Sequence, residues 1–348
     1  MTVAADSAHR RQPRENPRLL SLVIPAFNEE DVLPMLRPRL EALLESLPCP
    51  GELIFVDDGS RDRTALLLRA WAGQDRRVKV LELSRNFGHQ AAVTAGTDHA
   101  AGDAVVIMDA DLQDPPELVH RMLERYREGY DVVYAQRARR EGETALKRAT
   151  AALFYWIMRR FVHRELPAAT GDFRLMSRDV AEALRHLREG QRFIRGMVTW
   201  LGYTQTAVVF DRPSRAAGTT KYPLRKMLSF AWDAILSFSS APLRATVYLG
   251  FGTVLFGLVV AGYSVFRWTQ GVTVAGWTTI IVLQSFVGGI TLIGLGMVGE
   301  YIGRIYEESK QRPIYIIRRA TNARGLRPAT RSVTPRDGLE RAPEEPES

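Results

Sequence analysis

The 348-residue sequence contains only one cysteine, Cys49. A single thiol excludes an intramolecular disulfide and any cysteine-rich metal site, as expected for a protein kept in a reducing compartment. The first residues, 1–17, lack the apolar core of a secretory signal, and they are polar and rich in arginine. We therefore expect a disordered N-terminus and a folded part that stays in the compartment where it is made.

Charged residues are missing from two long stretches in the second half of the chain. None lies between Arg244 and Arg267, and none lies between Arg267 and Glu300. Each stretch is long enough to cross a hydrocarbon core about 30 Å thick, and two helices buried in a soluble core rarely lack charge over such lengths. We predict a transmembrane hairpin over residues 244–303, with spans at Ala245–Phe266 and Trp277–Val298.

Basic residues gather on one side of these predicted spans. The link from Arg267 to Gly276 contains a single basic residue, whereas many lie before the first span and after the second. Because positive charge accumulates on the cytoplasmic side, we expect the large N-terminal domain and both termini to be cytoplasmic, at the cell (inner or plasma) membrane. Five glycines of the second span would let helices approach closely and permit a homo-oligomer: Gly288, Gly289, Gly294, Gly296 and Gly299.

The segments that flank the hairpin differ in composition. Residues 222–243 mix Lys and Arg with Leu, Phe and Trp, which is typical of juxtamembrane amphipathic helices lying on the membrane surface. Residues 304–348 form a predicted cytoplasmic tail, which we expect to be disordered from about residue 324 because it is poor in apolar residues. The formal net charge of +8 favours an anionic partner, which could be nucleic acid, acidic lipid or a phosphorylated substrate.

Residues 18–221 alternate short apolar runs with longer amphipathic stretches, which predicts an α/β domain with a mostly parallel sheet. The first four predicted strands are 20–24, 52–56, 78–83 and 104–108. Polar clusters follow three of them, at Asn28-Glu29, Asp57-Asp58 and Asp109-Ala110-Asp111. Because ligands of open sheets bind beyond the carboxyl ends of the strands, we expect these clusters to share one site.

Asp109 and Asp111 form the clearest candidate metal site. They place two carboxylates on a tight turn after an apolar strand, with Gln113 close behind. A hard divalent cation takes oxygen ligands and keeps room for substrate phosphates. An acid-x-acid pair alone is weak evidence, because surface turns often contain aspartate. The neighbouring strand end at Asp57-Asp58 strengthens the interpretation.

Taken in order, five segments resemble the inverting glycosyltransferases of family two, and among them the polyprenyl-phosphate glycosyltransferases. The segments are VIPAFNEE (23–30), VDDGS (56–60), SRNFGH (84–89), MDADLQDPP (108–116) and GDFRLM (171–176). The two spans extend the resemblance, to bactoprenol glucosyltransferases and dolichol-phosphate mannose synthases, over about residues 19–317. It implies a GT-A type, Rossmann-like fold, followed by membrane-surface helices and two transmembrane helices.

The resemblance also implies a reaction, the inverting transfer of a hexose from a nucleotide-sugar to polyprenyl phosphate. The residues implied to hold the nucleotide are Pro25, Phe27, Glu29, Asp57 and Asp58. Those implied to bind Mg²⁺ or Mn²⁺ are Asp109, Asp111 and Gln113. Such a metal offsets negative charge on the departing diphosphate.

Asp111 and Asp172 are the implied catalytic residues. Asp172 matches the family position often assigned as the base, and a positioning role is an equal alternative. A phosphate monoester, with a second pKa of about 6, is already largely ionised at neutral pH and needs no strong base. His89 opens a predicted helix, where a structural or capping role is favoured.

An anionic acceptor needs cations, which bind phosphate through charge-assisted hydrogen bonds. The candidate residues for the acceptor phosphate are Arg137, Lys147, Arg148, Thr150, Arg215 and Lys221. For any one basic residue, a solvated surface role is the alternative. As a set close to the predicted membrane segments, they favour phosphate binding.

Three alternatives stay open from the sequence. A processive polysaccharide synthase shares the fold, but its Gln-x-x-Arg-Trp signature is replaced here by residues 191–195, QRFIR, and a displaced Trp200. A noncatalytic membrane scaffold or nucleotide sensor is the alternative from another class. The expected donor is UDP-glucose, and GDP-mannose is the alternative. The expected partners are therefore a nucleotide-sugar, polyprenyl phosphate and membrane lipid, but no nucleic acid.

Overall fold

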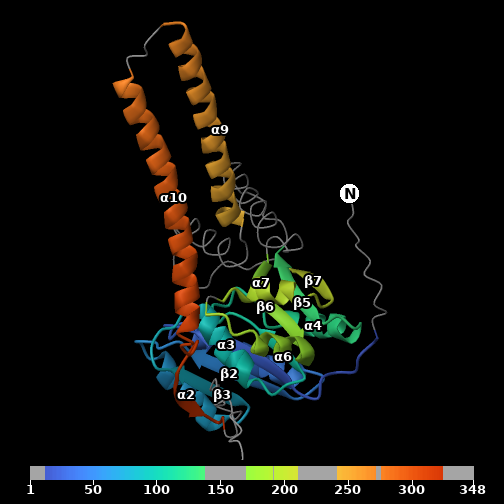
Figure 1. Ribbon diagram of the computed structural model, residues 1–348. Coiled ribbons are helices and arrows are strands. Elements are labelled where there is room, and N and C mark those ends of the chain that lie inside the picture. The colour runs from blue at the N-terminus through green and yellow to red at the C-terminus, as the bar shows by residue number, and fades with distance from the viewer. Residues whose placement is uncertain (1–11, 138–169, 191, 211–240, 272–275, 324–348) are drawn as a thin grey trace, which may run out of the picture.

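The computed structural model describes residues 12–137, 170–190, 192–210, 241–271 and 276–323 (Figure 1). They form one eight-stranded sheet with helices on both faces, and two long helices that project from this α/β domain. The strands are β1 (Leu20–Ala26), β2 (Gly51–Asp57), β3 (Val78–Leu83), β4 (Ala104–Ile107), β5 (Val132–Arg137), β6 (Thr170–Ser177), β7 (Gln205–Phe210) and β8 (Ile317–Thr321). The helices of the domain are α1 (Leu33–Ser46), α2 (Thr64–Gln74), α3 (His89–His99), α4 (Leu118–Arg127), α6 (Arg178–His186) and α7 (Ile194–Trp200).

The sheet has the strand order β7-β5-β6-β4-β1-β2-β3-β8. Strands β4, β1, β2 and β3 are parallel, as are β5 and β7, whereas β6 and β8 run antiparallel to their neighbours. The predicted α/β class and mostly parallel sheet are therefore confirmed. The four predicted strands are present, with ends that differ by a few residues.

The central strands are buried on both faces because successive side chains point to opposite sides of a strand. Leu22 belongs to the core cluster on one face and Val23 to that on the other. Helix α3 lies especially close to the second face, since a Cβ at Gly96 would fall 2.2 Å from Val23 Cγ1. The first turn of α3 is thereby fixed at the carboxyl edge of the sheet.

The chain returns to the sheet after the long helices, which the sequence analysis did not anticipate. Strand β8 pairs antiparallel with β3 and so closes one edge of the sheet. Just before it, Tyr315 is buried and its hydroxyl donates to Asp98 Oδ2 at 2.8 Å. Treating residues 304–348 wholly as a tail, and ending the domain at residue 221, was therefore wrong for the part up to residue 323.

The N-terminal boundary also needs correction, because residues 12–17 are in part fixed. Arg14 forms an ion pair with Asp131, and its guanidinium lies 5.4 Å from the centre of the Tyr126 ring. Its backbone N–H donates to the Arg127 carbonyl at 2.9 Å. A composition-based prediction of disorder over residues 1–17 cannot detect such pairing with a distant strand.

The two long helices are α9 (Ala241–Thr269) and α10 (Trp277–Ser309). Each contains a candidate membrane span by length and composition, at Ala245–Arg267 and Phe286–Ser309, and neither span is buried within the chain. The second candidate span lies further along the chain than predicted.

A Cβ at any of the five glycines from Gly288 to Gly299 would meet nothing within 4 Å, so these glycines are not required for α9 and α10 to approach. Of the predicted surface helices at 222–243, all but the last three residues lie outside the described residues.

Candidate active site

Strand register brings two acidic motifs of the sequence, MDADLQDPP and GDFRLM, to one place. Strands β4 and β6 are antiparallel, with Ile107 opposite Arg174. Continuing this register by two residues places Asp109 opposite Asp172. Carboxylates far apart in the sequence therefore meet where β4 ends, at the edge of the sheet predicted for ligands.

A cavity of about 640 Å³ opens at this edge. Among its lining residues are six predicted from the sequence: Pro25, Phe27, Glu29, Asp58, Asp109 and Asp111. They come from the carboxyl ends of β1, β2 and β4, which are neighbours in the sheet. The ring of Phe27 is 41% exposed, so it can form part of the opening of the cavity.

The paired aspartates after β2 have different surroundings. Asp58 lines the cavity, and its carboxylate accepts the backbone N–H groups of Phe87 at 2.7 Å and Gly88 at 2.9 Å. Asp57 is buried, does not line the cavity, and accepts the N–H of Ser60 at 3.3 Å. Burial raises the pKa of both carboxyls, and the hydrogen bonds oppose that shift. Asp57 therefore supports the turn, and Asp58 is the one that faces the cavity.

The carboxylates of Asp109 and Asp111 offer oxygen atoms to the cavity. Asp109 Oδ1 is buried and accepts no hydrogen bond from the described residues, with His89 Nε2 at 3.7 Å. Asp111 Oδ1 accepts the N–H of Gln113 at 3.1 Å across a turn in which Leu112 has a φ of 60°. An orphaned oxygen beside a second carboxylate fits a hard divalent cation that completes its shell with substrate phosphates.

Gln113 is less well placed for a metal than predicted. Its side chain is buried, and its Oε1 has no hydrogen-bond partner in the described part of the chain, but it does not line the cavity. Over the same residues, no group of three or more His, Cys, Asp or Glu side chains is arranged to hold a metal ion.

Asp172 lies at the centre of a hydrogen-bond network next to these carboxylates. Its Oδ1 accepts from Arg195 Nε at 3.2 Å and Nη2 at 3.1 Å. Its Oδ2 accepts from Gln90 Nε2 at 3.2 Å and lies 3.1 Å from His89 Nε2. Arg174 Nη2 is 3.9 Å away. Helices α3 and α7 supply these partners, so the network joins both helices to the end of β6.

Electrostatics distinguish the roles of Asp172, His89 and Asp109. Burial alone would raise the pKa of Asp172, but Arg195, the hydrogen bond with His89 and Arg174 hold it well below its usual range. Burial alone would lower the pKa of His89, but Asp172 and Asp109 raise it. Burial, Asp172 and Asp111 together raise the pKa of Asp109, against the effect of His89. Asp172 is therefore a firmly ionised anchor and a weak base.

The sequence analysis missed several members of this site. His89 lines the cavity and contacts Asp172, so the favoured structural or capping role was incomplete. Gln90 and Arg195 were not predicted, although Arg195 belongs to the QRFIR segment that was used only to exclude a synthase. The position of His89 within SRNFGH was the available signal.

The predicted acceptor residues are largely outside the described residues. Arg137 is the last residue of β5. The others, which fall in the segments 138–169 and 211–240, are Lys147, Arg148, Thr150, Arg215 and Lys221. Their role in binding an acceptor phosphate stays a prediction.

Comparisons with known proteins bear directly on this site. The model of Glycosyl transferase family 2 matches residues 21–185. An uncharacterized glycosyltransferase, YkcC of Bacillus subtilis, is 47% identical over 303 residues, which are 86% of this chain and 93% of the relative. The bactoprenol glucosyl transferase of Shigella phage SfV is 39% identical over 300 residues, covering 86% of this chain and 98% of the relative.

Among solved structures, glucosyl-3-phosphoglycerate synthase from Mycobacterium tuberculosis, in complex with Mn²⁺, UDP and phosphoglyceric acid, gives a TM-score of 0.47 at 21% identity. It covers 63% of this chain and 76% of its own. The sequence relatives carry the assignment, because their identity extends over nearly the whole of each relative. On that basis the protein is a glycosyltransferase and belongs to glycosyl transferase family 2.

Proposed function

We propose that this glycosyltransferase transfers a hexose from a nucleotide-sugar to polyprenyl phosphate, with inversion at the anomeric carbon. The product is a polyprenyl-monophosphate sugar for the assembly or modification of cell-envelope glycans. One observation carries the proposal: the acidic cavity belongs to a chain that also has two long apolar helices, as expected for a lipid-borne acceptor. The 39% identity to bactoprenol glucosyl transferases supports the same acceptor class.

The donor binds in the cavity at the carboxyl edge of β1, β2 and β4. Glu29 and Asp58 supply acceptors for the N–H groups of the base and the hydroxyls of the ribose, beside Pro25 and Phe27. Asp57, whose carboxylate accepts the backbone N–H of Ser60, holds the turn that follows Asp58. UDP-glucose is the proposed donor, in line with the relatives named as glucosyl transferases. GDP-mannose is the competing donor.

Asp109 and Asp111 are the residues proposed to hold Mg²⁺ or Mn²⁺, with Gln113 in a supporting position. A divalent cation at these carboxylates supplies positive charge that offsets the charge on the departing diphosphate. The unpartnered Oδ1 of Asp109 supports this role, because a buried carboxylate oxygen without a partner is costly. Burial and the charges of Asp172 and Asp111 raise the pKa of Asp109, and a bound cation would oppose that shift.

The acceptor attacks through a phosphate oxygen that is already ionised, since the second pKa of a phosphate monoester is about 6. Asp172 is therefore a positioning residue in this proposal. Its carboxylate holds the imidazole of His89 at the cavity wall and anchors Arg195 on α7. Asp172 and Asp109 raise the pKa of His89, and its ring lines the cavity, where an N–H can donate to an anionic oxygen.

The two apolar helices anchor the enzyme in the cell membrane in this proposal. Basic side chains follow the second candidate span closely, at Lys310 and Arg312, and Arg304 lies in its last turns. By the positive-inside rule they favour a cytoplasmic location for the catalytic domain and both termini, where nucleotide-sugars are made available to the site. Assembly into a homo-oligomer is compatible with the exposed apolar faces of both helices.

The test uses the purified full-length protein in a neutral detergent. It is incubated with polyprenyl phosphate, Mn²⁺ or Mg²⁺, and one labelled donor at a time from a panel that includes UDP-glucose and GDP-mannose, followed by organic extraction. We expect label in the lipid phase with UDP-glucose and a divalent metal, and none with chelator. The Asp111→Asn variant should lose transfer.

A matched surface change, Asp31→Asn, serves as the control because Asp31 is exposed and does not line the cavity. Transfer from GDP-mannose alone would replace the proposed donor and leave the acceptor intact. Transfer from no donor, or equal transfer by Asp111→Asn, would refute the reaction.

A further inference from the structure

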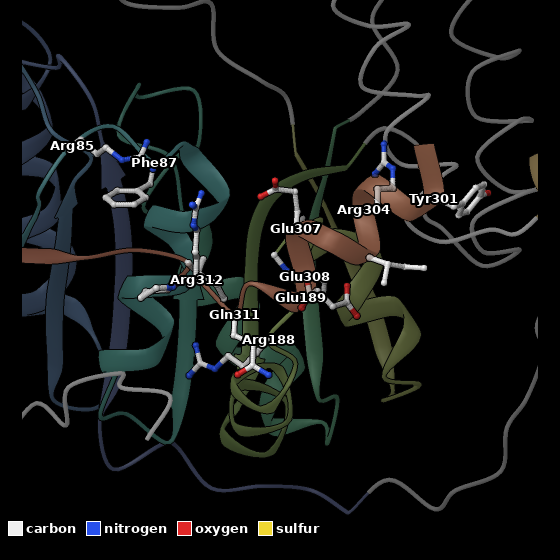
Figure 2. A pocket seen from close by; sticks show the side chains of 14 residues that line it. Arg85, Phe87, Arg188, Glu189, Tyr301, Arg304, Glu307, Glu308, Gln311 and Arg312 are labelled. Atoms are coloured by element: carbon white, nitrogen blue, oxygen red, sulfur yellow. Dashed lines mark hydrogen bonds between the residues drawn. The ribbon is translucent and has the colours of Figure 1, made fainter. Parts of the chain in front are cut away.

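A second cavity lies between the end of α10 and the catalytic domain (Figure 2). Its volume is about 620 Å³. Its walls come from α10 and the segment that follows it, from the loop after β3, and from the connection between α6 and α7. None of its lining residues lines the active-site cavity. It is a separate site on the described part of the chain.

Four arginines line this second cavity, and two of them are already paired. Arg188 Nη1 contacts Asp98 Oδ2 at 2.6 Å, and Arg304 Nη2 contacts Glu300 Oε1 at 3.1 Å. The other two are Arg85 and Arg312, for which no carboxylate partner lies within ion-pair distance in the described residues. Both are exposed, and Figure 2 shows Arg85 next to Phe87, with Arg312 on the segment that follows α10.

Among the described residues, the acidic side chains of the cavity form no ion pair with these two arginines, although the charges of Arg312 and Glu307 interact. Glu308 accepts the backbone N–H of Gly190 at 2.8 Å, and Glu307 is paired with Lys310. Burial raises the pKa of Glu189, the charge of Arg192 lowers it, and the charge of Glu308 raises it. Arg85 stacks on Phe87, with 4.1 Å from its guanidinium carbon to the ring centre, and donates only to the carbonyl of Asn86 at 3.2 Å. Two guanidinium groups are thus available to an anion, and their planar shape suits phosphate.

The apolar surroundings of the cavity point to a lipid. Ile305 lines the cavity and is 67% exposed, and its neighbours Ile302 and Tyr306 are 59% and 61% exposed. All three lie within the candidate span that ends at Ser309. A lipid whose acyl chains lie along this exposed face of α10 can place its phosphate beside Arg312 and Arg85. A free phosphate would make no use of the apolar face.

The loop after β3 separates this cavity from the reacting groups. Arg85 and Phe87 face the second cavity, whereas Asn86, Gly88 and His89 line the active-site cavity. The backbone of the loop is tied to the nucleotide side by the two hydrogen bonds to Asp58 and by close contact with Gly59, where a Cβ would fall 2.6 Å from Arg85 C. A phosphate bound at Arg85 lies behind this backbone and cannot be the one that attacks the sugar.

We infer that the second cavity binds the phosphate headgroup of an anionic membrane lipid that is not the acceptor, through Arg85 and Arg312. Bound there, the lipid fastens the loop of residues 84–88 against the turn that carries Asp58. It also joins the end of α10 to the catalytic domain. The inference goes beyond the proposed function and does not depend on which sugar or acceptor the enzyme uses.

The test measures lipid binding by the full-length protein in nanodiscs of phosphatidylcholine with a rising fraction of phosphatidylglycerol. Native mass spectrometry counts the phosphatidylglycerol molecules that stay bound to the protein after the protein is released from the nanodisc. We expect Arg85→Gln and Arg312→Gln each to weaken retention about tenfold, because each removes a charge-assisted contact. The matched control is Arg319→Gln, which removes the same charge from an exposed residue of β8 outside the cavity. Arg312→Lys keeps the charge but not the planar group and should lie between wild type and Arg312→Gln.

Three outcomes overturn the inference. The first is equal retention of phosphatidylglycerol by all variants. The second is displacement of the lipid by millimolar inorganic phosphate, with the same sensitivity to Arg85→Gln, which would make the cavity a site for soluble phosphate. The third is unchanged phosphatidylglycerol retention together with lost binding of polyprenyl phosphate, which would make the cavity part of the acceptor site. Retention is measured without turnover, so failure of the proposed reaction would leave these results interpretable.

Discussion

Replacing Tyr315 with phenylalanine tests how firmly the segment after α10 is docked on α3. The Tyr315 hydroxyl donates to Asp98 Oδ2 at 2.8 Å, and its ring meets that of His99 edge-on with centres 6.1 Å apart. Phenylalanine keeps the ring and removes only the hydroxyl. Asp98 is not left unpaired, because Arg188 Nη1 contacts the same oxygen at 2.6 Å.

The size of the effect follows from that geometry. A hydrogen bond to a charged group contributes about 1.5–3 kcal/mol, and the shared acceptor places this one near the lower limit, about 1.5 kcal/mol. In a domain of roughly 200 residues, a loss of about 1 kcal/mol lowers Tm by about 2–4 °C. We therefore expect Tyr315→Phe to lower Tm by about 3–6 °C.

The assay is thermal unfolding of the full-length protein in neutral detergent, with tryptophan fluorescence as the signal. Tyr306→Phe is the control, since Tyr306 is 61% exposed and its ring contact with Lys310 survives the change. Trypsin should also cut faster after Arg318 and Arg319, which are exposed on β8, because the docked strand opens more often. Equal melting temperatures and equal cleavage rates for Tyr315→Phe and Tyr306→Phe would show that the docking contributes no stability.

Three further changes test other parts of the structure. Asp111→Asn should lower the transfer rate at least about a hundredfold at saturating Mn²⁺, because it removes a charge proposed to hold the metal, and steady-state kinetics measures this. Gly96→Ala should lower the free energy of unfolding by about 1–3 kcal/mol through the clash with Val23, whereas Gly73→Ala, which meets nothing within 4 Å, should not. His99 is buried, and burial lowers its pKa. Its stabilising contribution is therefore complete above about pH 6.5 and declines as the pH falls. The His99→Gln variant should lose less Tm than the wild type between about pH 7 and pH 5.5.

The sequence predicted the parallel half of the sheet well because each strand there carries its own signal. Apolar runs buried on both faces are followed at once by polar residues that belong to the site, as at Asp58 and Asp109. The polar residues can then be placed at one edge of the sheet without knowledge of the strand order, because the carboxyl ends of parallel strands share that edge. Local pattern and global position agree for these elements.

The parts that were missed depend on partners far away in the chain. Strand β8 is short and basic, and only its pairing with β3 gives it structure. Arg195 gains its role from Asp172, which reaches it through the antiparallel strand β6. Arg14 is held in position by its ion pair with Asp131. A single sequence shows none of these distances, so composition assigned residues 1–17 to disorder and residues 304–323 to a tail.

Strand β8 makes the two long apolar helices, α9 and α10, an insertion within the catalytic fold. A protein shortened before α9 would leave β3 as an uncovered border, with open backbone N–H and C=O groups that invite pairing with another molecule. A soluble version of the enzyme therefore needs residues 310–323 joined back to the domain by a linker that replaces both helices. Removing the chain from α9 onward leaves the fold one strand short.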